Sequence, residues 1–361
     1  MHKLKTKLIW IALGLGAVAL RALFSGYPEV VEQYYSQAFF PVIRWSIDYL
    51  LAWFPVPLVY PFLLLLFLLT IRQVRLWWKR TYANFWYKSL DAALGIGASL
   101  SGVVFFFLFM WGFNYGRIPL ENQLGLELTP LSLKELKAEL NHETAQIKRL
   151  RNLIPGATTE PISNNMLPAS MESLLRGEVE QLLDSHGYPT VGRVRGMYVY
   201  PTGIFLRFSS SGLYFPWTGE GHVDAGLHSL QKPFVMAHEL SHGYGFGDEG
   251  TCNFLAFLSC IQSKDPVIAY SGHLNYWRTL AANYRYYEPE KYREFRESLP
   301  LGIQSDLDAI NEVLLRYPDF MPHLRYVAYD AYLKAQGIEE GMLNYDRVIM
   351  MAHAWRLSQR I

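Results

Sequence analysis

The chain has 361 residues and a formal net charge of +1, so it has room for more than one domain and no charge excess that would attract nucleic acid. Hydrophobic residues make up 51% of the chain and aromatic residues 15%, which is high for a soluble enzyme. The apolar residues are concentrated near the N-terminus, which indicates membrane-spanning segments. The two cysteines, Cys252 and Cys260, lie eight residues apart on one predicted helix, too far for a disulfide, and we expect them to pack as small apolar groups.

Three apolar stretches are long enough to cross a membrane. They cover roughly residues 8–24, 50–71 and 92–113. We therefore expect an α-helical membrane anchor with three spans in residues 1–116, in contact with a lipid bilayer. Residues 117–361 have the mixed composition of one globular domain, which is large enough for its own core.

Positively charged residues flank these spans on one side. Lys3, Lys5 and Lys7 precede the first span, and five more cations lie between the second and third spans: Arg72, Arg75, Lys79, Arg80 and Lys88. Because positive residues stay in the cytoplasm, we expect a cytoplasmic N-terminus and an extracytoplasmic globular domain. The first span could instead be a cleaved signal peptide, but its length and the lack of a small-residue cleavage site favour an uncleaved anchor.

The globular part has mostly helical periodicity. We expect helices over residues 132–152, 170–185, 289–299, 303–317, 326–337 and 345–361. Alternating aromatic, β-branched and polar residues over 193–208 and 212–217 predict a small antiparallel sheet. The fold class is therefore mainly α, of the α+β type. The segment 212–217 is a candidate edge strand for pairing with an extended substrate, and a buried hairpin is an equally good interpretation.

The stretch 238–242 has the spacing of a zinc site. His238 and His242 lie four residues apart, so on a helix they share one face and can offer two imidazole nitrogens to one ion. Glu239 lies about 100° further round the helix, where it can act as a base without being a ligand. A catalytic zinc ion (Zn2+) is held by three protein ligands and keeps one position open for water.

A carboxylate from the following helix is the expected third ligand. Glycines at positions 243, 245 and 247 predict a tight reversal, after which Asp248 and Glu249 open a second apolar helix. We favour Glu249 as ligand and Asp248 as N-cap, with Asp248 as the alternative ligand. Asn253, four residues after Glu249, is placed to hydrogen-bond a ligand histidine.

Peptide hydrolysis also needs a donor for the tetrahedral oxygen. Four downstream side chains are candidates for this catalytic role: Tyr345, Tyr270, His273 and Arg347. His222 and His228 precede the motif and are rival ligands, although single histidines more often pack or lie on the surface.

These motifs carry a family resemblance. The site resembles that of the gluzincin peptidases, although six residues between His242 and Glu249 is a short spacing for that group. The whole chain is similar to a bacterial membrane-protein family of unknown function described as zinc-metallopeptidase-like. The matching stretches are residues 111–117, 214–220, 238–260, 270–272 and 344–348. The resemblance implies a zincin-like metallopeptidase domain anchored in the bacterial cytoplasmic membrane. Thr251 stands where relatives carry a second acid, which favours Glu249 as ligand or indicates an inactive site.

The sequence thus predicts a membrane-anchored zinc metallopeptidase, most simply an endopeptidase, that acts on a peptide or protein substrate. Glu239 would be the general base. The alternative is a catalytically inactive metal-binding ectodomain that binds or senses envelope peptides. A transporter is disfavoured because the three spans contain few polar groups. The sequence predicts neither the cleavage preference nor the oligomeric state.

Overall fold

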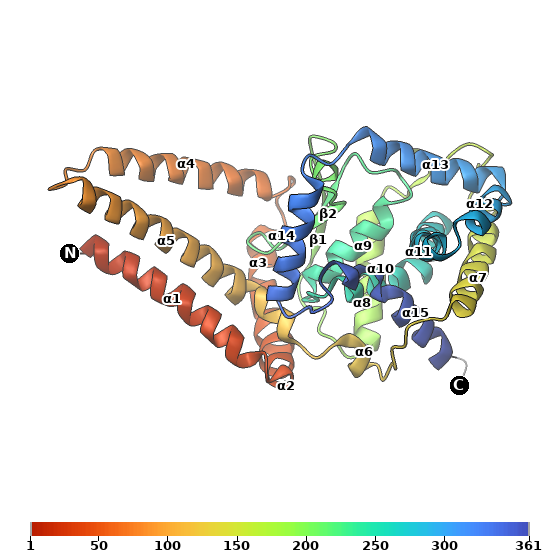
Figure 1. The fold of residues 1–361 in the computed structure, drawn as a ribbon, viewed down its shortest axis with the longest axis horizontal. Helices are drawn as coiled ribbons and strands as arrows, with labels where there is room; N and C mark the ends of the chain where they lie inside the picture. The colour runs from red at the N-terminus through yellow and green to blue at the C-terminus, as the bar shows by residue number, and fades with distance from the viewer. Residues whose placement is uncertain (1, 360–361) are drawn as a thin grey trace.

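The computed structural model describes residues 2–359 and is mostly helical. Three long helices project from one side of a globular body: α1 (His2–Phe24), α4 (Val59–Trp78) and α5 (Phe85–Met110) (Figure 1). All three are long and apolar enough to cross a membrane, and they overlap the three apolar stretches predicted from the sequence. The second span begins at Val59 rather than near residue 50, because Pro55 and Pro57 lie in the turn before it.

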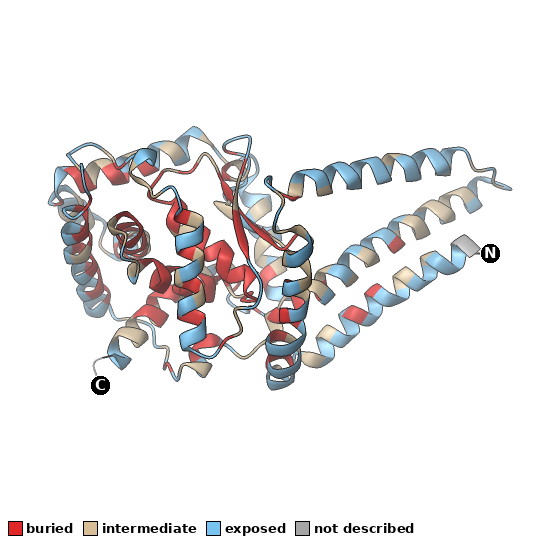
Figure 2. Cartoon of the chain, turned by 180° about the vertical axis from the view of Figure 1, so that it is seen from behind, coloured by how far each residue is buried: buried red, intermediate tan, exposed pale blue. Residues whose placement is uncertain are grey.

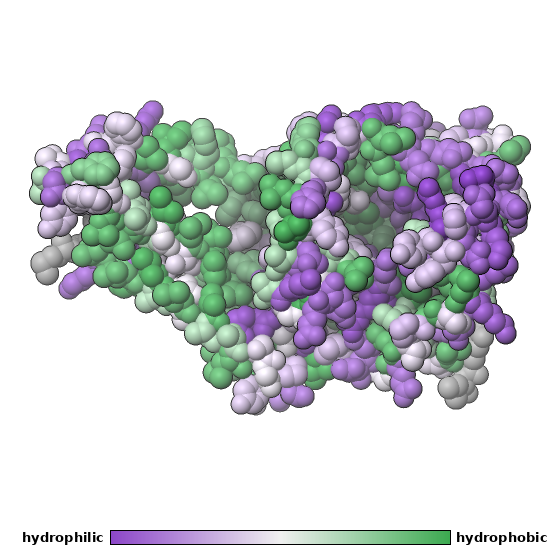
Figure 3. Space-filling view, viewed as in Figure 1, coloured by the Kyte–Doolittle hydropathy of each residue, from purple (hydrophilic) through white to green (hydrophobic). Residues whose placement is uncertain are grey.

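The side chains of these helices are largely exposed, as expected for surfaces that face lipid. Helix α1 packs along α5, with Gly14 lying directly against Ser101. Helix α4 stands apart from both for most of its length and buries none of its residues (Figure 1). The space-filling view shows apolar residues gathered over the projecting helices and polar residues over the globular body (Figure 3).

The segment between the first two spans packs on the globular body. It forms α2 (Pro28–Val30), the π-helix η1 (Val31–Phe39) and α3 (Phe40–Leu51). On α3, the buried guanidinium of Arg44 donates to the Tyr214 hydroxyl (3.1 Å) and to the Gly219 carbonyl (2.8 Å). On η1, the Glu32 carboxylate pairs with Arg117 at 2.6 Å. These buried polar contacts attach the globular part firmly to the helices that lead into the spans.

After α5, the chain passes through short helices into the globular body. These are η2 (Gly112–Gly116) and α6 (Leu120–Gln123), followed by two long amphipathic helices, α7 (Leu133–Arg151) and α8 (Met171–Ser185), with η3 (Asn164–Met166) between them. Both long helices match the predicted ranges. Helix α7 begins with a capping box in which Ser132 and Glu135 satisfy each other's backbone N–H groups.

The sheet has three strands: β1 (Arg195–Val199), β2 (Gly212–Phe215) and β3 (Glu220–Asp224), in the order β1-β3-β2. Strand β2 is antiparallel to β3, but β1 is parallel to β3, so the predicted antiparallel sheet is a mixed sheet instead. The reason lies in the long loop after β1, which includes η4 (Leu206–Phe208). The Asp224 carboxylate accepts backbone N–H groups from Gly203 and Phe205, and this loop carries the chain past β3 before it returns.

The core lies between the sheet and the central helices α9 (Lys232–Gly243), α10 (Glu249–Ile261) and α11 (Pro266–Tyr287), which Figure 2 shows as the most buried elements. The remaining elements are α12 (Pro289–Glu297), α13 (Leu301–Arg316), α14 (Pro322–Ala335), η5 (Gly341–Asp346) and α15 (Arg347–Ser358). Helix α11 was not predicted, because its 22 residues mix apolar, polar and aromatic side chains without a clear apolar stripe. Cys252 and Cys260 are free and fully buried in α10.

Candidate metal centre

Helix α9 presents both motif histidines on one buried face. Pro233 lies in its first turn, and the helix packs against β3, so residues 236–243 are buried. The Nε2 atoms of His238 and His242 lie 3.1 Å apart. After the helix, Gly245 adopts a φ of +91°, a left-handed conformation that suits glycine and reverses the chain toward α10.

This reversal brings Glu249 to the two histidines. Its Oε2 atom lies 3.1 Å from Nε2 of His238 and 3.5 Å from Nε2 of His242. In a tetrahedral zinc site with bonds of about 2.0–2.1 Å, ligand atoms lie ~3.3–3.4 Å from one another. The three atoms therefore have the spacing that one zinc ion requires, and the set of two imidazoles and one carboxylate is one that zinc accepts.

Asp248 has a different place. Its side chain accepts the backbone N–H of Thr251 at 2.6 Å and so caps the N-terminus of α10. The other carboxylate oxygen accepts a hydrogen bond from the Asn344 side chain at 2.8 Å. The structure thus gathers Glu249, rather than its neighbour Asp248, with the two histidines.

Hydrogen bonds on the far side of each imidazole fix its orientation. Nδ1 of His238 lies 2.9 Å from Oδ1 of Asn253, whose amide nitrogen donates to the Tyr345 carbonyl at 3.2 Å. Nδ1 of His242 lies 2.7 Å from the Phe246 carbonyl. Both acceptors require a proton on Nδ1, so each Nε2 can direct a lone pair at the ion. Asn253 therefore has the contact that its spacing predicts.

Glu239 lies beside this triangle without joining it. The residue is 4% exposed, and its Oε2 atom has no hydrogen-bond partner within residues 2–359. Burial raises the pKa of Glu239, and the neighbouring His238 and His242 offset only part of that effect. A buried carboxylate with an unsatisfied oxygen is costly to keep in a fold and is a common feature of functional sites.

A tyrosine that the sequence did not single out touches the candidate ligand. The Tyr329 hydroxyl on α14 donates to Oε1 of Glu249 at 2.8 Å, and the Tyr345 hydroxyl donates to Tyr329 at 3.4 Å. Burial acts to raise the pKa of Glu249, but the charges and hydrogen bonds of His242 and His238 outweigh it and hold that pKa well below 4.5. A lowered pKa favours the anionic form that a metal ligand needs. No motif marks Tyr329. The only signal is its place in a tyrosine-rich helix.

The other side chains that the sequence offers as oxyanion donors or ligands have hydrogen-bond or ion-pair partners outside the triangle of His238, His242 and Glu249. The Tyr270 hydroxyl donates to the buried carboxylate of Asp306 at 2.7 Å, so it is committed to a network away from the triangle. His273 pairs with Glu143 at 2.6 Å, and Arg347 pairs with Glu121. The two rival histidine ligands have partners of their own. Nδ1 of His222 in β3 lies 3.3 Å from the Leu213 carbonyl, and His228 accepts the backbone N–H of Leu230. Of the predicted oxyanion donors, the structure brings Tyr345 nearest to the triangle.

The end of the third apolar helix contacts the helix that carries both histidines. The indole N–H of Trp111 donates to the His242 carbonyl at 2.8 Å, and the Arg117 guanidinium donates to the Gly245 carbonyl at 3.0 Å. Trp111 is itself buried against Tyr214 of β2. The candidate centre is thus attached directly to the helix that leads out of the apolar region.

Comparison with known proteins gives one match. A family model with the description "Protein of unknown function (DUF3810)" matches residues 35–352. No curated protein and no solved structure matches the chain. The match covers both the second and third apolar helices and the whole triangle of candidate ligands, but its description names no activity and no metal.

Proposed function

We propose that this chain, which belongs to the family described as "Protein of unknown function (DUF3810)", is a membrane-anchored zinc-dependent peptidase with a zincin-like catalytic domain. One observation carries the proposal. Nε2 of His238, Nε2 of His242 and Oε2 of Glu249 lie 3.1–3.5 Å from one another, with the buried carboxylate of Glu239 next to them. Two imidazoles, one carboxylate and a separate base are what a hydrolytic zinc site needs.

The side chains of the site have distinct roles in this proposal. Zinc held by the three ligands would polarise the substrate carbonyl and lower the pKa of a water molecule. Glu239 accepts the proton of the attacking water and passes it to the departing amine. Its raised pKa helps the second step, because a weaker acid holds the proton until the amine receives it. Tyr345 and Tyr329 supply hydroxyl groups on the α14 side of the ligands.

The β2 edge gives a place for an extended substrate. Strand β2 pairs only with β3, so its other edge is free of strand partners in the described part of the chain. Gly212 of β2 lies directly against the Glu239 carboxylate. A peptide that adds as a strand along β2 would have its backbone next to the base.

The membrane orientation follows from the positions of the cations. The N-terminal end of α1 and the connection between α4 and α5 lie at the same end of the projecting helices, away from the globular body (Figure 1). Lys5 and Lys7 belong to the first, and Lys79 and Arg80 to the second. By the positive-inside rule, we place that end in the cytoplasm and the catalytic domain outside, on a bacterial cytoplasmic membrane.

The experiment compares the full chain with its Glu239→Gln variant, both purified in detergent and incubated with a peptide library. The first protein should cleave peptides, and the variant should be slower by about 10²- to 10⁴-fold, the usual contribution of a general base. Zinc content is the control and should be equal in both. Equal turnover in the two proteins, or none in either despite bound zinc, would contradict a peptidase and favour a metal-binding module.

A further inference from the structure

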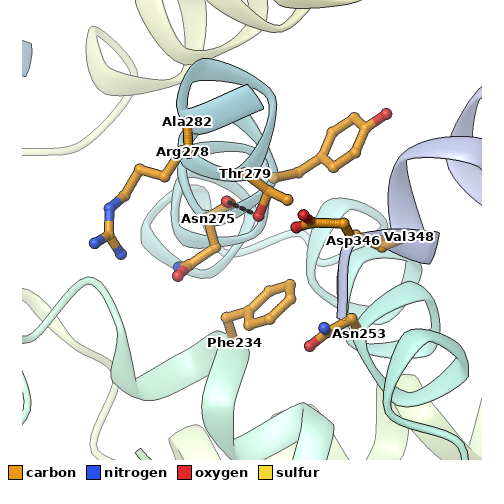
Figure 4. Close-up of a pocket in the computed structure, with 9 residues that line it drawn as sticks. Phe234, Asn253, Asn275, Arg278, Thr279, Ala282, Asp346 and Val348 are labelled. Carbon is orange, nitrogen blue, oxygen red and sulfur yellow. Dashed lines mark hydrogen bonds between the residues drawn. The ribbon is translucent and has the colours of Figure 1, made fainter. Parts of the chain in front are cut away.

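A pocket of about 300 Å³ lies beside the candidate metal centre. Its walls come from α9, α10, α11 and the junction of η5 with α15, and include Phe234, Asn253, Asn275, Arg278, Thr279 and Asp346. Figure 4 shows Asn275 and Thr279 directed from α11 toward the centre of the view, with Phe234 below them. Asp346 and Asn253 lie on one side of this centre and Arg278 on the other.

The pocket is one helical turn away from two candidate ligands. Phe234 precedes His238 by four residues on α9, and Asn253 follows Glu249 by four residues on α10. Residues four apart share one face of a helix, separated by about 5–6 Å. Asn253 also contacts His238 directly, with 2.9 Å between Oδ1 and Nδ1. The pocket therefore borders the turns of α9 and α10 next to the candidate ligands, on the side of His238 that carries Nδ1.

Arg278 is the cation of the pocket, and it makes no hydrogen bond or ion pair with residues 2–359. Arg151 and Arg176 of the globular body, by contrast, are paired, Arg151 with Asp306 at 2.7 Å and Arg176 with Glu172 at 2.7 Å. The Arg278 side chain is only partly exposed, and burial lowers its pKa. A guanidinium nevertheless stays charged in proteins, so its unmatched charge fits a site that receives an anion.

The side-chain donors of Asn275 and Thr279, which flank Arg278 on α11, are already used. The Asn275 amide nitrogen donates to the carbonyls of Leu230 (3.2 Å) and Ser271 (2.9 Å), and the Thr279 hydroxyl donates to the Asn275 carbonyl (3.3 Å). Arg278 is left with its planar set of N–H groups, which matches the two oxygens of a carboxylate. The Asp346 carboxylate on the opposite side can accept backbone N–H groups that precede such a carboxylate in a peptide.

We infer that Arg278 receives the free α-carboxylate of a peptide substrate, so that the enzyme removes residues from the C-terminal end rather than cutting within a chain. This inference rests on the proposed peptidase function. It assigns the pocket to the last residues of the substrate and Arg278 to the recognition of its charged end. Phe234 then packs against a side chain among the last residues of the substrate.

The test measures binding, so that it does not depend on turnover. The full chain with Glu239→Gln is mixed in detergent with two hexapeptide libraries that carry a dye at the N-terminus. One library ends in a free carboxylate and the other in an amide. We expect the carboxylate library to bind about 10- to 100-fold more tightly, as for a charged hydrogen bond. Arg278→Gln should remove this difference, and Arg293→Gln, at an exposed position of α12, should keep it.

Several outcomes would overturn the inference. These are equal binding of the two libraries, a preference that persists in Arg278→Gln, or equally tight binding of an amidated library that ends in a glutamate side chain. Displacement of both libraries by inorganic phosphate without a carboxylate preference would show a general anion site instead. If the chain containing Glu239 cleaves peptides but shows no carboxylate preference, this inference fails while the peptidase stands. An Arg278-dependent carboxylate preference without turnover in the chain containing Glu239 would leave Arg278 as the carboxylate site and would count against the peptidase and the C-terminal trimming.

Discussion

The backbone of Gly212 in β2 lies directly against the Oε1 atom of Glu239 in α9, so that a Cβ atom at position 212 would overlap this carboxylate. The carbonyl of His222 on the neighbouring strand closes the same space from the other side, at 2.7 Å from that Cβ position. Only glycine therefore fits between β3 and the proposed base. This contact fixes the position of Glu239 relative to the strand that we assign to substrate pairing.

The first prediction concerns this contact. Gly212→Ala should displace the Glu239 carboxylate, because the backbone at His222 cannot move as a flexible side chain would. We expect a loss of peptide turnover of about 10²-fold, since small displacements of a catalytic group have effects of this size. Zinc content should be unchanged, because Gly212 does not contact the three candidate ligands. Wild-type turnover in this variant would show that the position of Glu239 does not matter.

The second prediction concerns Asn253, which orients His238. Asn253→Ala should weaken zinc binding by about 10- to 100-fold, the usual effect of removing a group that holds a ligand histidine. Asn253→Asp keeps an oxygen for the Nδ1–H group and should lose much less affinity. Competition with a chromogenic chelator measures both values. Asn152→Ala, at an exposed position after α7, is the matched control. Equal affinities for all of these proteins would contradict the role of Asn253.

The third prediction concerns pH and His228. Burial and the nearby cations Lys232 and Arg278 outweigh the Asp306 charge, so the pKa of His228 lies below 6.5, and its Nδ1 accepts the Leu230 N–H. Between the folded-state pKa and 6.5 the unfolded chain binds more protons than the folded chain, so stability falls as the pH drops through 6.5. It levels off below the folded-state pKa.

His228→Asn keeps a hydrogen-bond acceptor but removes this titration. The unfolding temperature of the variant should therefore fall less between pH 7.5 and pH 5 than that of the wild type, as measured in detergent at constant ionic strength. His323→Asn, at an exposed position of α14, should retain the wild-type slope. The same pH dependence in all three proteins would contradict a neutral, half-buried His228.

Much of the site was accessible to sequence reasoning, because it depends on local spacing. The four-residue interval between His238 and His242 and the glycines that follow them are enough to predict two facing helices. The Asp248–Glu249 pair was ambiguous in sequence, since both acids open the same helix. The hydrogen bond from Thr251 to Asp248 is what separates the cap from the residue that faces the histidines.

Contacts between distant segments could not be predicted in this way. Tyr329 reaches Glu249 across 80 residues, and no spacing rule connects them. The parallel pairing of β1 with β3 depends on the path of the loop that Asp224 holds, which the alternation of side chains does not encode. Similarly, the mixed composition of α11 concealed the helix that forms most of the Arg278 pocket.

The most direct measurement of the central claim is the zinc stoichiometry of the full chain and of two variants at adjacent acids. Glu249→Ala removes a proposed ligand, whereas Asp248→Ala removes the N-cap, at a cost of about 1 kcal/mol in stability, and the hydrogen bond from Asn344, but no proposed ligand. We predict one zinc ion per chain in the wild type and in Asp248→Ala, and loss of tightly bound zinc in Glu249→Ala. Zinc that stays bound in Glu249→Ala but is lost in Asp248→Ala, or a wild-type chain that binds none, would contradict the metal centre.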